Sequence, residues 1–380
     1  MSGPAAGTAH AATTTDVVCL GESMVTFLPS QPGRLADVPS FGRGIGGAES
    51  NVACALAAAG HRAAWVGRVG ADGFGDHLVE TIAGYGVDTS AVRRDPDRPT
   101  GIYFRTATDR GAGAHEVAYY RAGSAASAMS PANVPYEELF AGRILHLSGI
   151  TAALSADCLA LLRELTAPRP GRPLVSFDVN HRPRLWRDGD AGVLLELARR
   201  CDLVFVGEDE AEEAWGIVGA EAIRAALPEP SVVVVKRGSA GATVFASGPR
   251  PGPRSSNAGG ADSAAGGAEA GERAAQAAGR DTVTVVPALH VDVVAAVGAG
   301  DAFAAGFLSA TLRGLPVRDR VRHGHLMAAA VLTVPGDLTE PPARDHADRL
   351  VALDDGAWGR LRLGPGWTAA DRAHEEVRTP

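Results

Sequence analysis

Short apolar runs alternate with helix-length segments over the second half of the chain. The runs are residues 144–147, 174–178, 203–206 and 231–235, and helical segments such as 155–165 and 191–199 separate them. Parallel strands cannot be joined by a tight turn, so each helix serves as the crossover that returns the chain to the same end of the sheet. This pattern predicts an α/β fold with a mostly parallel sheet covered by helices.

Polar residues and glycines follow several of these runs directly. They are Asp178, Asn180, Glu208, Lys236 and Gly238. In a sheet of this kind, ligands bind beyond the carboxyl ends of the strands. We therefore expect these residues to gather around a ligand site at that end of the sheet.

The composition argues against several classes of protein. The chain has 380 residues, of which 46% are hydrophobic, and this is enough for one doubly wound domain with a large core. Its formal net charge of −8 argues against a nucleic-acid partner. The first 33 residues contain no Lys or Arg and no long apolar run, so we expect neither a secretory signal nor a membrane span.

The four cysteines are Cys19, Cys54, Cys158 and Cys201. They are too far apart in sequence for a CxxC metal pair or a dense disulfide framework, so a reducing compartment, the cytoplasm, is the expected location. The basic residues are almost all arginines, as is typical of a GC-rich genome, and Lys236 is the only lysine.

Composition also divides the chain into a folded body and poorly folding segments. Residues 1–15 are predicted to be a disordered lead. Residues 248–280 contain almost no large apolar side chain and cannot offset the entropy of ordering, so we predict a disordered insertion there. The folded domain is expected at residues 16–355, followed by a C-terminal tail at 356–380 in which Trp358 and Trp367 could pack on the body.

Residues 101–106 and 117–121 are two strand-like runs joined by a glycine-rich turn. This arrangement predicts an exposed hairpin. The polar side chains Tyr103, Arg105 and Tyr120 either face solvent on this hairpin or contact a ligand, and the pattern alone leaves both open.

Residues 297–308 combine a glycine- and alanine-rich loop with an apolar run at helical spacing. Such a loop at a helix N-terminus exposes backbone N–H groups to an anion, which the helix dipole also favours. Asp301 in this loop could either cap the helix or take a proton from a hydroxyl group. We expect residues 291–294 to form the strand before it.

Several motifs resemble those of the ribokinase-like (PfkB) sugar kinases. Residues 298–307, beginning Gly-Ala-Gly-Asp, resemble the second signature of that family. Residues 46–53, Gly-Gly-Ala-Glu-Ser-Asn-Val-Ala, followed by 67–76, resemble the first. Residues 234–242 resemble the family's glycine turn near the nucleotide, and 328–337 resemble the helix and turn that flank its adenine pocket. The resemblance covers about residues 16–353 in the right order.

The resemblance implies a three-layer α/β/α sandwich with a small β-sheet lid, formed by about residues 21–43 and 99–122. It also implies ATP-dependent phosphorylation of a sugar hydroxyl in the presence of Mg²⁺. The residues implied in catalysis are Asp301 as the base and Gly298, Ala299 and Gly300 as the anion-binding loop. Those implied in substrate binding are Gly46, Gly47, Asn51, Tyr103, Arg105, Tyr120, Asn180 and Arg182. Those implied in nucleotide binding are Glu210, Lys236, Gly238, Gly241 and Gly300, and Glu210 would also contact Mg²⁺ through water.

One branch of the family fits best. Residues 178–186, Asp-Val-Asn-His-Arg-Pro-Arg-Leu-Trp, resemble a segment of the 2-keto-3-deoxygluconate kinases, and so does Tyr119-Tyr120-Arg121. Arginine suits an acid substrate because its planar guanidinium binds a carboxylate through two hydrogen bonds. Arg105 and Arg182 are therefore the predicted carboxylate ligands, although a structural salt bridge is an alternative role for Arg182.

The chain departs from the family at three positions. Ala295 and Ala296 stand where the family has Asp-Thr, and Gly207 stands where it has the asparagine of an Asn-x-x-Glu motif. Activation by a monovalent cation is therefore doubtful. Two alternatives stay open: a kinase for a neutral sugar or a nucleoside, and a non-catalytic sugar-binding protein. Pairing of two subunits through their lids is a further expectation from the resemblance.

Overall fold

The computed structural model describes residues 15–106, 116–186, 189–247 and 281–369. Its central sheet has eight strands in the order β14-β13-β12-β11-β10-β9-β1-β4. Their bounds are β1 (Val17–Leu20), β4 (Ala63–Val66), β9 (Ile144–Ser148), β10 (Leu174–Asp178), β11 (Leu203–Gly207), β12 (Val232–Lys236), β13 (Ala242–Ala246) and β14 (Thr282–Val286). The strands from β4 to β12 are parallel, and β13 and β14 add an antiparallel edge. The predicted, mostly parallel sheet is confirmed.

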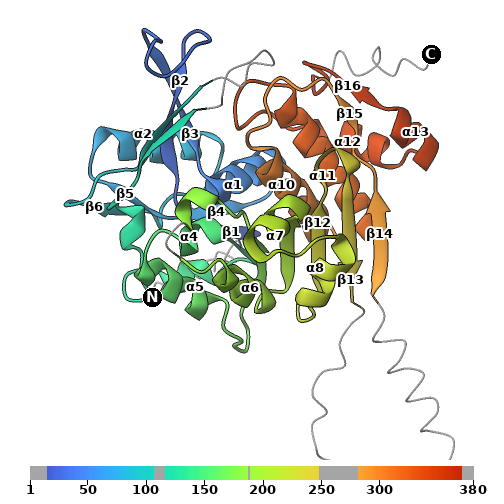
Figure 1. Cartoon of the computed structure of the whole chain (residues 1–380), viewed down its shortest axis with the longest axis horizontal. Coiled ribbons are helices and arrows are strands. Elements are labelled where there is room, and N and C mark those ends of the chain that lie inside the picture. Colours follow the sequence, from blue (N-terminus) through green and yellow to red (C-terminus); the bar gives the residue numbers. More distant parts are fainter. Residues whose placement is uncertain (1–14, 107–115, 187–188, 248–280, 370–380) are drawn as a thin grey trace, which may run out of the picture.

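Helices cover both faces of this sheet (Figure 1). One face carries α1 (Ala48–Ala58), α2 (Gly73–Gly84), α10 (Ala299–Leu312), α11 (Val317–Leu332) and α12 (Arg344–Val351). The other carries α5 (Ala156–Leu165), α6 (Gly192–Arg199), α7 (Glu208–Trp215) and α8 (Ala220–Ala226). Strand β11 is apolar throughout because both of its faces are buried. Phe205 packs into the core under α1 and α10, whereas Val204 and Val206 pack into the core on the other face of the sheet.

A second sheet of four strands projects from the body beside α2 (Figure 1). It contains β3 (Phe41–Gly46), β2 (Met24–Pro29), β7 (Ile102–Arg105) and β8 (Val117–Tyr120) in that order. Strands β7 and β8 are antiparallel, which confirms the predicted hairpin, and its turn at 107–115 lies outside the described residues. We call this sheet the lid.

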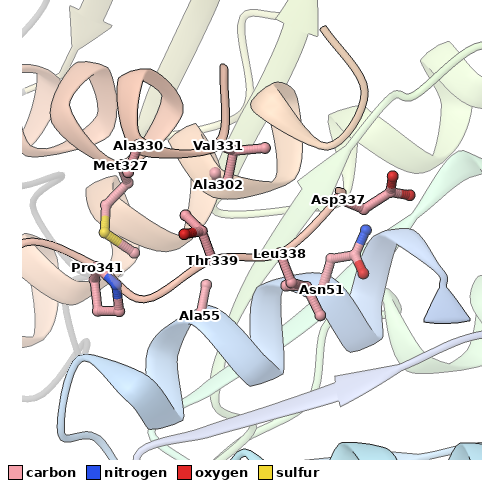
Figure 2. A pocket seen from close by; sticks show the side chains of 10 residues that line it. All are labelled: Asn51, Ala55, Ala302, Met327, Ala330, Val331, Asp337, Leu338, Thr339 and Pro341. Carbon is pink, nitrogen blue, oxygen red and sulfur yellow. The ribbon is translucent and has the colours of Figure 1, made fainter. Parts of the chain in front are cut away.

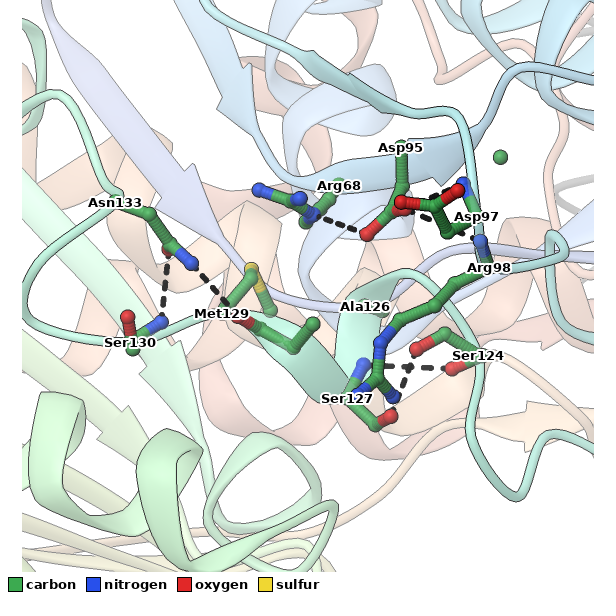
Figure 3. A network of polar contacts seen from close by, with 12 residues as sticks. Arg68, Asp95, Asp97, Arg98, Ser124, Ala126, Ser127, Met129, Ser130 and Asn133 are labelled. Carbon is green, nitrogen blue, oxygen red and sulfur yellow. Dashed lines mark hydrogen bonds and ion pairs between the residues drawn. The ribbon is translucent and has the colours of Figure 1, made fainter.

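Both ends of the hairpin are anchored by a polar network at the base of the lid (Figure 3). Asp95 ends the short strand β6 (Arg93–Asp95), which pairs with β5 (Arg68–Gly70), and its carboxylate accepts from Arg68 Nε at 2.8 Å. The same carboxylate accepts from the backbone N–H of Asp97 and of Arg98. Beyond β8, the N–H of Ala125 donates to Pro99 O at 2.8 Å, so the two chain segments that enter and leave the hairpin are tied together.

The smaller elements complete the body. They are α3 (Tyr136–Leu139), α4 (Gly149–Ala152), α13 (Asp355–Arg360), β15 (His290–Val291), β16 (Arg362–Leu363), η1 (Ala126–Ala128), η2 (Pro183–Leu185) and η3 (Gly238–Ala240). The strand predicted at 291–294 is wrong in extent, because β15 pairs only with β16 and does not join the central sheet. Helix α10 is held instead by the packing of Phe303 and Phe307 on Phe205 of the central sheet.

The body continues past the predicted boundary at residue 355. Trp358 in α13 and Trp367 are buried, at 1% and 2% exposure, and the guanidinium of Arg322 lies 4.5 Å from the centre of the Trp358 ring. Residues 1–14, 248–280 and 370–380, where disorder or a tail was predicted, lie outside the described residues. Over the described part of the chain, no helix is both long and apolar enough to cross a membrane.

Candidate active site

The carboxyl ends of three adjacent strands bring polar groups together on one face of the sheet. Asp178 ends β10, Gly207 ends β11 and Lys236 ends β12. The N-terminus of α10 belongs to the helical layer on this same face, because Phe303 and Phe307 of α10 pack on Phe205 of β11. The predicted site residues therefore gather at the carboxyl ends of the strands, as expected for a parallel sheet.

Helix α10 begins at a glycine that cannot be replaced without strain. Gly298 is the N-cap, with φ of 80°, a left-handed conformation that only glycine adopts readily. A Cβ atom on Gly298 would also lie 2.5 Å from the backbone oxygen of Asp337. Asp301 stands in the first turn but makes no capping bond, so the simple capping role considered for it is excluded. The predicted anion-binding loop, Gly298 to Gly300, is thus the N-terminal turn of α10, where the helix dipole favours an anion.

The Asp301 carboxylate is held by a residue 250 positions away in sequence. Asn51 in α1 donates from Nδ2 to Asp301 Oδ2 at 2.8 Å. Burial raises the pKa of Asp301 to about 7, opposed by the Asn51 hydrogen bond, while Asp178 raises it further and Arg182 and Lys236 lower it. A carboxylate with a pKa near 7 is suited to accepting a proton at neutral pH.

Lys236 lies beside the same helix terminus. Its ammonium is 3.0 Å from each carboxylate oxygen of Asp178, and the position that a Cβ on Gly300 would take is 3.7 Å away. The two glycines of the following turn, Gly238 and Gly241, have φ of 53° and 104°. A Cβ on Gly241 would collide with the backbone of β14, so this turn also requires glycine.

Arg182 and Glu210 face each other near the site. Arg182 Nη1 is 3.7 Å from Glu210 Oε1, and the Arg182 side chain is about half exposed, at 51%. Glu210 Oε2 accepts the N–H of Gly207 at 2.8 Å, which completes the first turn of α7. Asn180 has φ of 42° and is buried, and its Oδ1 has no hydrogen-bond partner.

The donor set does not form a metal cage. The described residues contain no group of three or more His, Cys, Asp or Glu side chains that could hold a metal ion. Glu210 is the one predicted metal contact, and both of its oxygens already have protein neighbours. This set fits Mg²⁺ that is bound mainly by phosphate oxygens and water, with Glu210 in the outer shell, because Mg²⁺ retains its waters readily.

The lid residues Tyr103 and Arg105 lie close to the anion-binding loop but contact protein groups. Arg105 Nη2 is 2.6 Å from Asp337 Oδ1, and both side chains are at least 95% buried. The Tyr103 hydroxyl is 3.4 Å from Asp337 Oδ2, and a Cβ on Gly46 would collide with that hydroxyl. Burial raises the pKa of Asp337, and the Arg105 guanidinium opposes this. The Arg105 guanidinium, which was predicted to bind the carboxylate of the substrate, thus binds a carboxylate of the protein itself.

The structure separates Tyr120 from Tyr103. Tyr103 pairs with Tyr119 across the hairpin, whereas Tyr120 packs edge-on against Phe104 on the opposite face and is 65% exposed. Side chains of successive residues in a strand point to opposite faces, so only one of the two tyrosines can share the face of Tyr103. Tyr119 is therefore the tyrosine that shares the face of Tyr103, and the predicted ligand Tyr120 lies on the other face of the hairpin.

A buried carboxylate that the sequence reasoning did not single out supports the start of α1. Glu49 is fully buried and accepts from Ser148 Oγ at 2.7 Å and from Thr151 Oγ1 at 2.8 Å. Burial raises its pKa to about 7, and the two hydroxyl groups lower it. Glu49 thereby joins α1 to β9 and α4 two residues before Asn51. Its place between Gly47 and Asn51 in the first motif was the available signal.

Glu22, which follows β1, is a second such residue. Its carboxylate forms an ion pair with Arg121 at the end of the lid and accepts from Ser124 Oγ at 2.9 Å. The Glu22 backbone oxygen also lies 2.5 Å from the position of a Cβ on Gly47, which explains that glycine. Arg121 is therefore bound to the body, as Arg105 is.

A small pocket lies behind Asn51 and Asp337, between α1, α10 and α11 (Figure 2). Ala302, Met327 and Pro341 also line it. The room for water-sized groups in it is about 10 Å³, which suffices for one water molecule at most. This pocket is too small for a sugar.

Together, a parallel sheet covered by helices, a lid, and a helix N-terminus flanked by a carboxylate and an ammonium are typical of kinases that phosphorylate small molecules. The sequence model of the family described as pfkB family carbohydrate kinase matches residues 14–256 and 269–344. The chain belongs to this family and is an ATP-dependent carbohydrate kinase.

Individual relatives support this assignment. The chain is 34% identical over 337 residues to the 2-dehydro-3-deoxygluconokinase of Bacillus subtilis (strain 168), which covers 87% of this chain and 93% of the relative. It is 31% identical over 340 residues to the 2-dehydro-3-deoxygluconokinase of Thermoproteus tenax, with 88% and 94% covered. The crystal structure of a PfkB protein from Polaromonas sp. JS666 superimposes with a TM-score of 0.70 at 30% identity, covering 89% of this chain and all of that one.

The pKa of Asp301 predicts the pH dependence of turnover. If this carboxylate must be ionised to act, kcat/KM should fall about tenfold per pH unit below pH 7 and level off above it. Asn51→Ala removes a donor that favours the ionised form, so the acid limb should move to higher pH. A pH profile of ADP formation, measured for both proteins with sugar at saturation and ATP varied, tests this. A flat profile from pH 5 to 8 in the parent would contradict it.

Proposed function

We propose that Asp301 accepts the proton of a sugar hydroxyl while that oxygen attacks the γ-phosphate of ATP. The observation that carries this proposal is the position of the Asp301 carboxylate: it is in the first turn of α10, held by Asn51, and close to the ammonium of Lys236. Backbone N–H groups from Gly298 to Gly300 would donate to the transferring phosphoryl group, whose negative charge the helix dipole also favours.

The nucleotide would lie beyond β12, where Gly238 and Gly241 keep the turn free of side chains. Lys236 would contact its phosphates. Mg²⁺, when bound, would neutralise charge on the phosphate oxygens, and Glu210 is the residue that could reach its water shell. The lid would close over the sugar and exclude water, which would limit ATP hydrolysis.

We propose a sugar acid, such as 2-keto-3-deoxygluconate, as the substrate. The support comes from Arg182, whose half-exposed side chain has one ion-pair neighbour among the described residues, Glu210 at 3.7 Å, and from the names of the relatives with 31–34% identity. Arg105 and Arg121 support it less, since their guanidinium groups already pair with Asp337 and Glu22. The same pairs favour the second candidate, a kinase for a neutral sugar or nucleoside.

The outer face of the lid supports pairing of two subunits. Phe27 and Phe104 stack there at 4.7 Å between ring centres, Phe41 packs edge-on against Phe104, and Tyr120 is exposed beside them. We propose that this face forms a homodimer contact and that the protein works in the cytoplasm, where ATP and a reducing environment are available.

Replacing the proposed base tests the mechanism. Asp301→Asn keeps a similar shape but cannot accept a proton, so kcat should fall about 100-fold or more with little change in nucleotide affinity. ADP formation over a panel of sugar acids and neutral sugars measures kcat, and calorimetry measures nucleotide binding. Turnover within threefold of the parent would show that another group accepts the proton.

Removing the proposed carboxylate ligand tests the substrate class. Arg182→Ala should raise KM for 2-keto-3-deoxygluconate about tenfold, which is about 1.4 kcal/mol, and leave KM for a neutral sugar unchanged. The exposure of this side chain argues against a larger effect. Arg163→Ala, which breaks an exposed ion pair with Glu196 on the opposite helical layer, is the matched control. Equal losses on acid and neutral substrates would favour a defect in the lid or in folding.

The alanine at position 295 predicts a weak response to monovalent cations. Ala295 is buried, and its N–H donates to Leu332 O at 3.3 Å. Because its side chain is a methyl group, it offers a cation no side-chain oxygen. A cation there would lack an opposite charge to offset its desolvation. We expect kcat to differ less than twofold between K⁺ and Na⁺ at equal ionic strength, and Ala295→Asp with Ala296→Thr to introduce K⁺ activation. Strong K⁺ activation of the parent would contradict this.

A further inference from the structure

Lys236 is the only lysine in a chain whose other basic residues are all arginines. A strong bias towards arginine explains the arginines but not the exception. The two side chains differ in shape: lysine ends in a compact ammonium with three donors, whereas arginine ends in a broad planar group. The lysine therefore marks a position where a compact cation is required.

The ammonium is fixed in place from across the sheet. Lys236 and Asp178 end β12 and β10, and the strand between them is β11. The register pairs Gly207, the last residue of β11, with Lys236. The Lys236 ammonium reaches past the end of β11 to both oxygens of Asp178, at 3.0 Å each.

Two of the three donors of the ammonium can thus bond the oxygens of Asp178, and no further hydrogen bond of the ammonium is found among the described residues, although the carboxylates of Glu210 and Asp301 also lie near it. Asp178 is buried, at 3% exposure, so its carboxylate is fixed and holds the lysine ammonium in one place. The ammonium also lies 3.7 Å from the position of a Cβ on Gly300, at the N-terminus of α10. The remaining donor is therefore held next to the backbone N–H groups that would receive a phosphoryl group.

We infer that Asp178 is a positioning residue that orients the Lys236 ammonium so that its free donor binds the phosphoryl group in transfer. This inference rests on the proposed function. In it, Lys236 is the residue that touches the nucleotide, and Asp178 acts only through Lys236. A guanidinium is longer and planar, so once bonded to Asp178 it would present its remaining donors at a different place from the ammonium.

A double-mutant cycle tests whether Asp178 acts through Lys236. Lys236→Met should lower kcat/KM for ATP about 100-fold and Asp178→Asn about tenfold, the scale for losing or misplacing one charged donor in a phosphoryl site. If Asp178 acts only through Lys236, the double variant should resemble Lys236→Met within threefold. A loss near 1,000-fold in the double variant, the product of the two, would overturn the inference. Lys236→Arg should lose activity as Lys236→Met does, and full activity in Lys236→Arg would contradict the need for an ammonium.

Binding gives a readout independent of turnover. By calorimetry, Lys236→Met and Asp178→Asn should each weaken a non-hydrolysable ATP analogue about tenfold and leave adenosine binding unchanged. Equal weakening of adenosine would show a general structural defect and overturn the positioning role. Asp202→Asn is the matched control: Asp202 pairs with Arg172 at 2.7 Å at the other end of the sheet, so the variant should lose stability without a change in either ligand.

The outcomes also separate this inference from the proposed function. Absence of ADP formation by the parent with every sugar would reject the proposed function, and the analogue and adenosine titrations would still decide the role of the pair. If the parent turns over normally and Lys236→Met keeps kcat/KM for ATP within threefold of the parent, the role of Lys236 and Asp178 is rejected and the proposed function is not. Should Asp178→Asn not fold, Asp178→Glu, which keeps the charge but moves the carboxylate, takes its place in the cycle and in the analogue titration.

Discussion

The packing of α10 onto the central sheet is the contact on which the rest of the site depends. Phe307 meets Phe205 of β11 edge-on with 5.4 Å between ring centres, and Phe303 does so at 6.4 Å. These aromatic contacts bury large apolar area and hold the helix in one position. The N-terminus of α10 is thereby fixed near the strand ends, within reach of Asn51 from α1 and of Lys236 from β12.

Burial of carboxyl groups connects the stability of this region to its chemistry. Asp301 and Glu49 both have a pKa of about 7, and in each case burial is the largest cause. Between their ordinary pKa values and pH 7 the folded chain binds these protons more tightly than the unfolded chain does. The stability contributed by the protonated forms is therefore lost as the pH rises through that window. This loss of stability accompanies a chemical property: a carboxyl group with a pKa near 7 can both release and accept a proton at neutral pH.

Two buried ion pairs join the lid to the body, beside the apolar contacts of Val25 and Ile45 with the core. Arg105 pairs with Asp337, and Arg121 pairs with Glu22, and all four side chains are largely or fully buried. Buried pairs of this kind gain little net stability, because the attraction is set against the cost of removing both charges from water. They specify geometry instead, and an anionic substrate would compete with Asp337 or Glu22 for the same guanidinium groups. With the acid substrate proposed above, the charge of the substrate and the position of the lid would therefore be linked.

The sequence by itself determined the elements whose signals are local. The apolar runs placed β9 to β12 within a residue or two, and the glycines at 298 and 300 marked the start of α10, because strand patterns and φ preferences act over a few residues. Only the tertiary structure decided which groups face each other. The pairing of Arg105 with Asp337 joins residues 232 positions apart, and the hairpin register decides that Tyr119, not Tyr120, shares the face of Tyr103. Such contacts arise from the packing of whole elements, so no short stretch of sequence contains them.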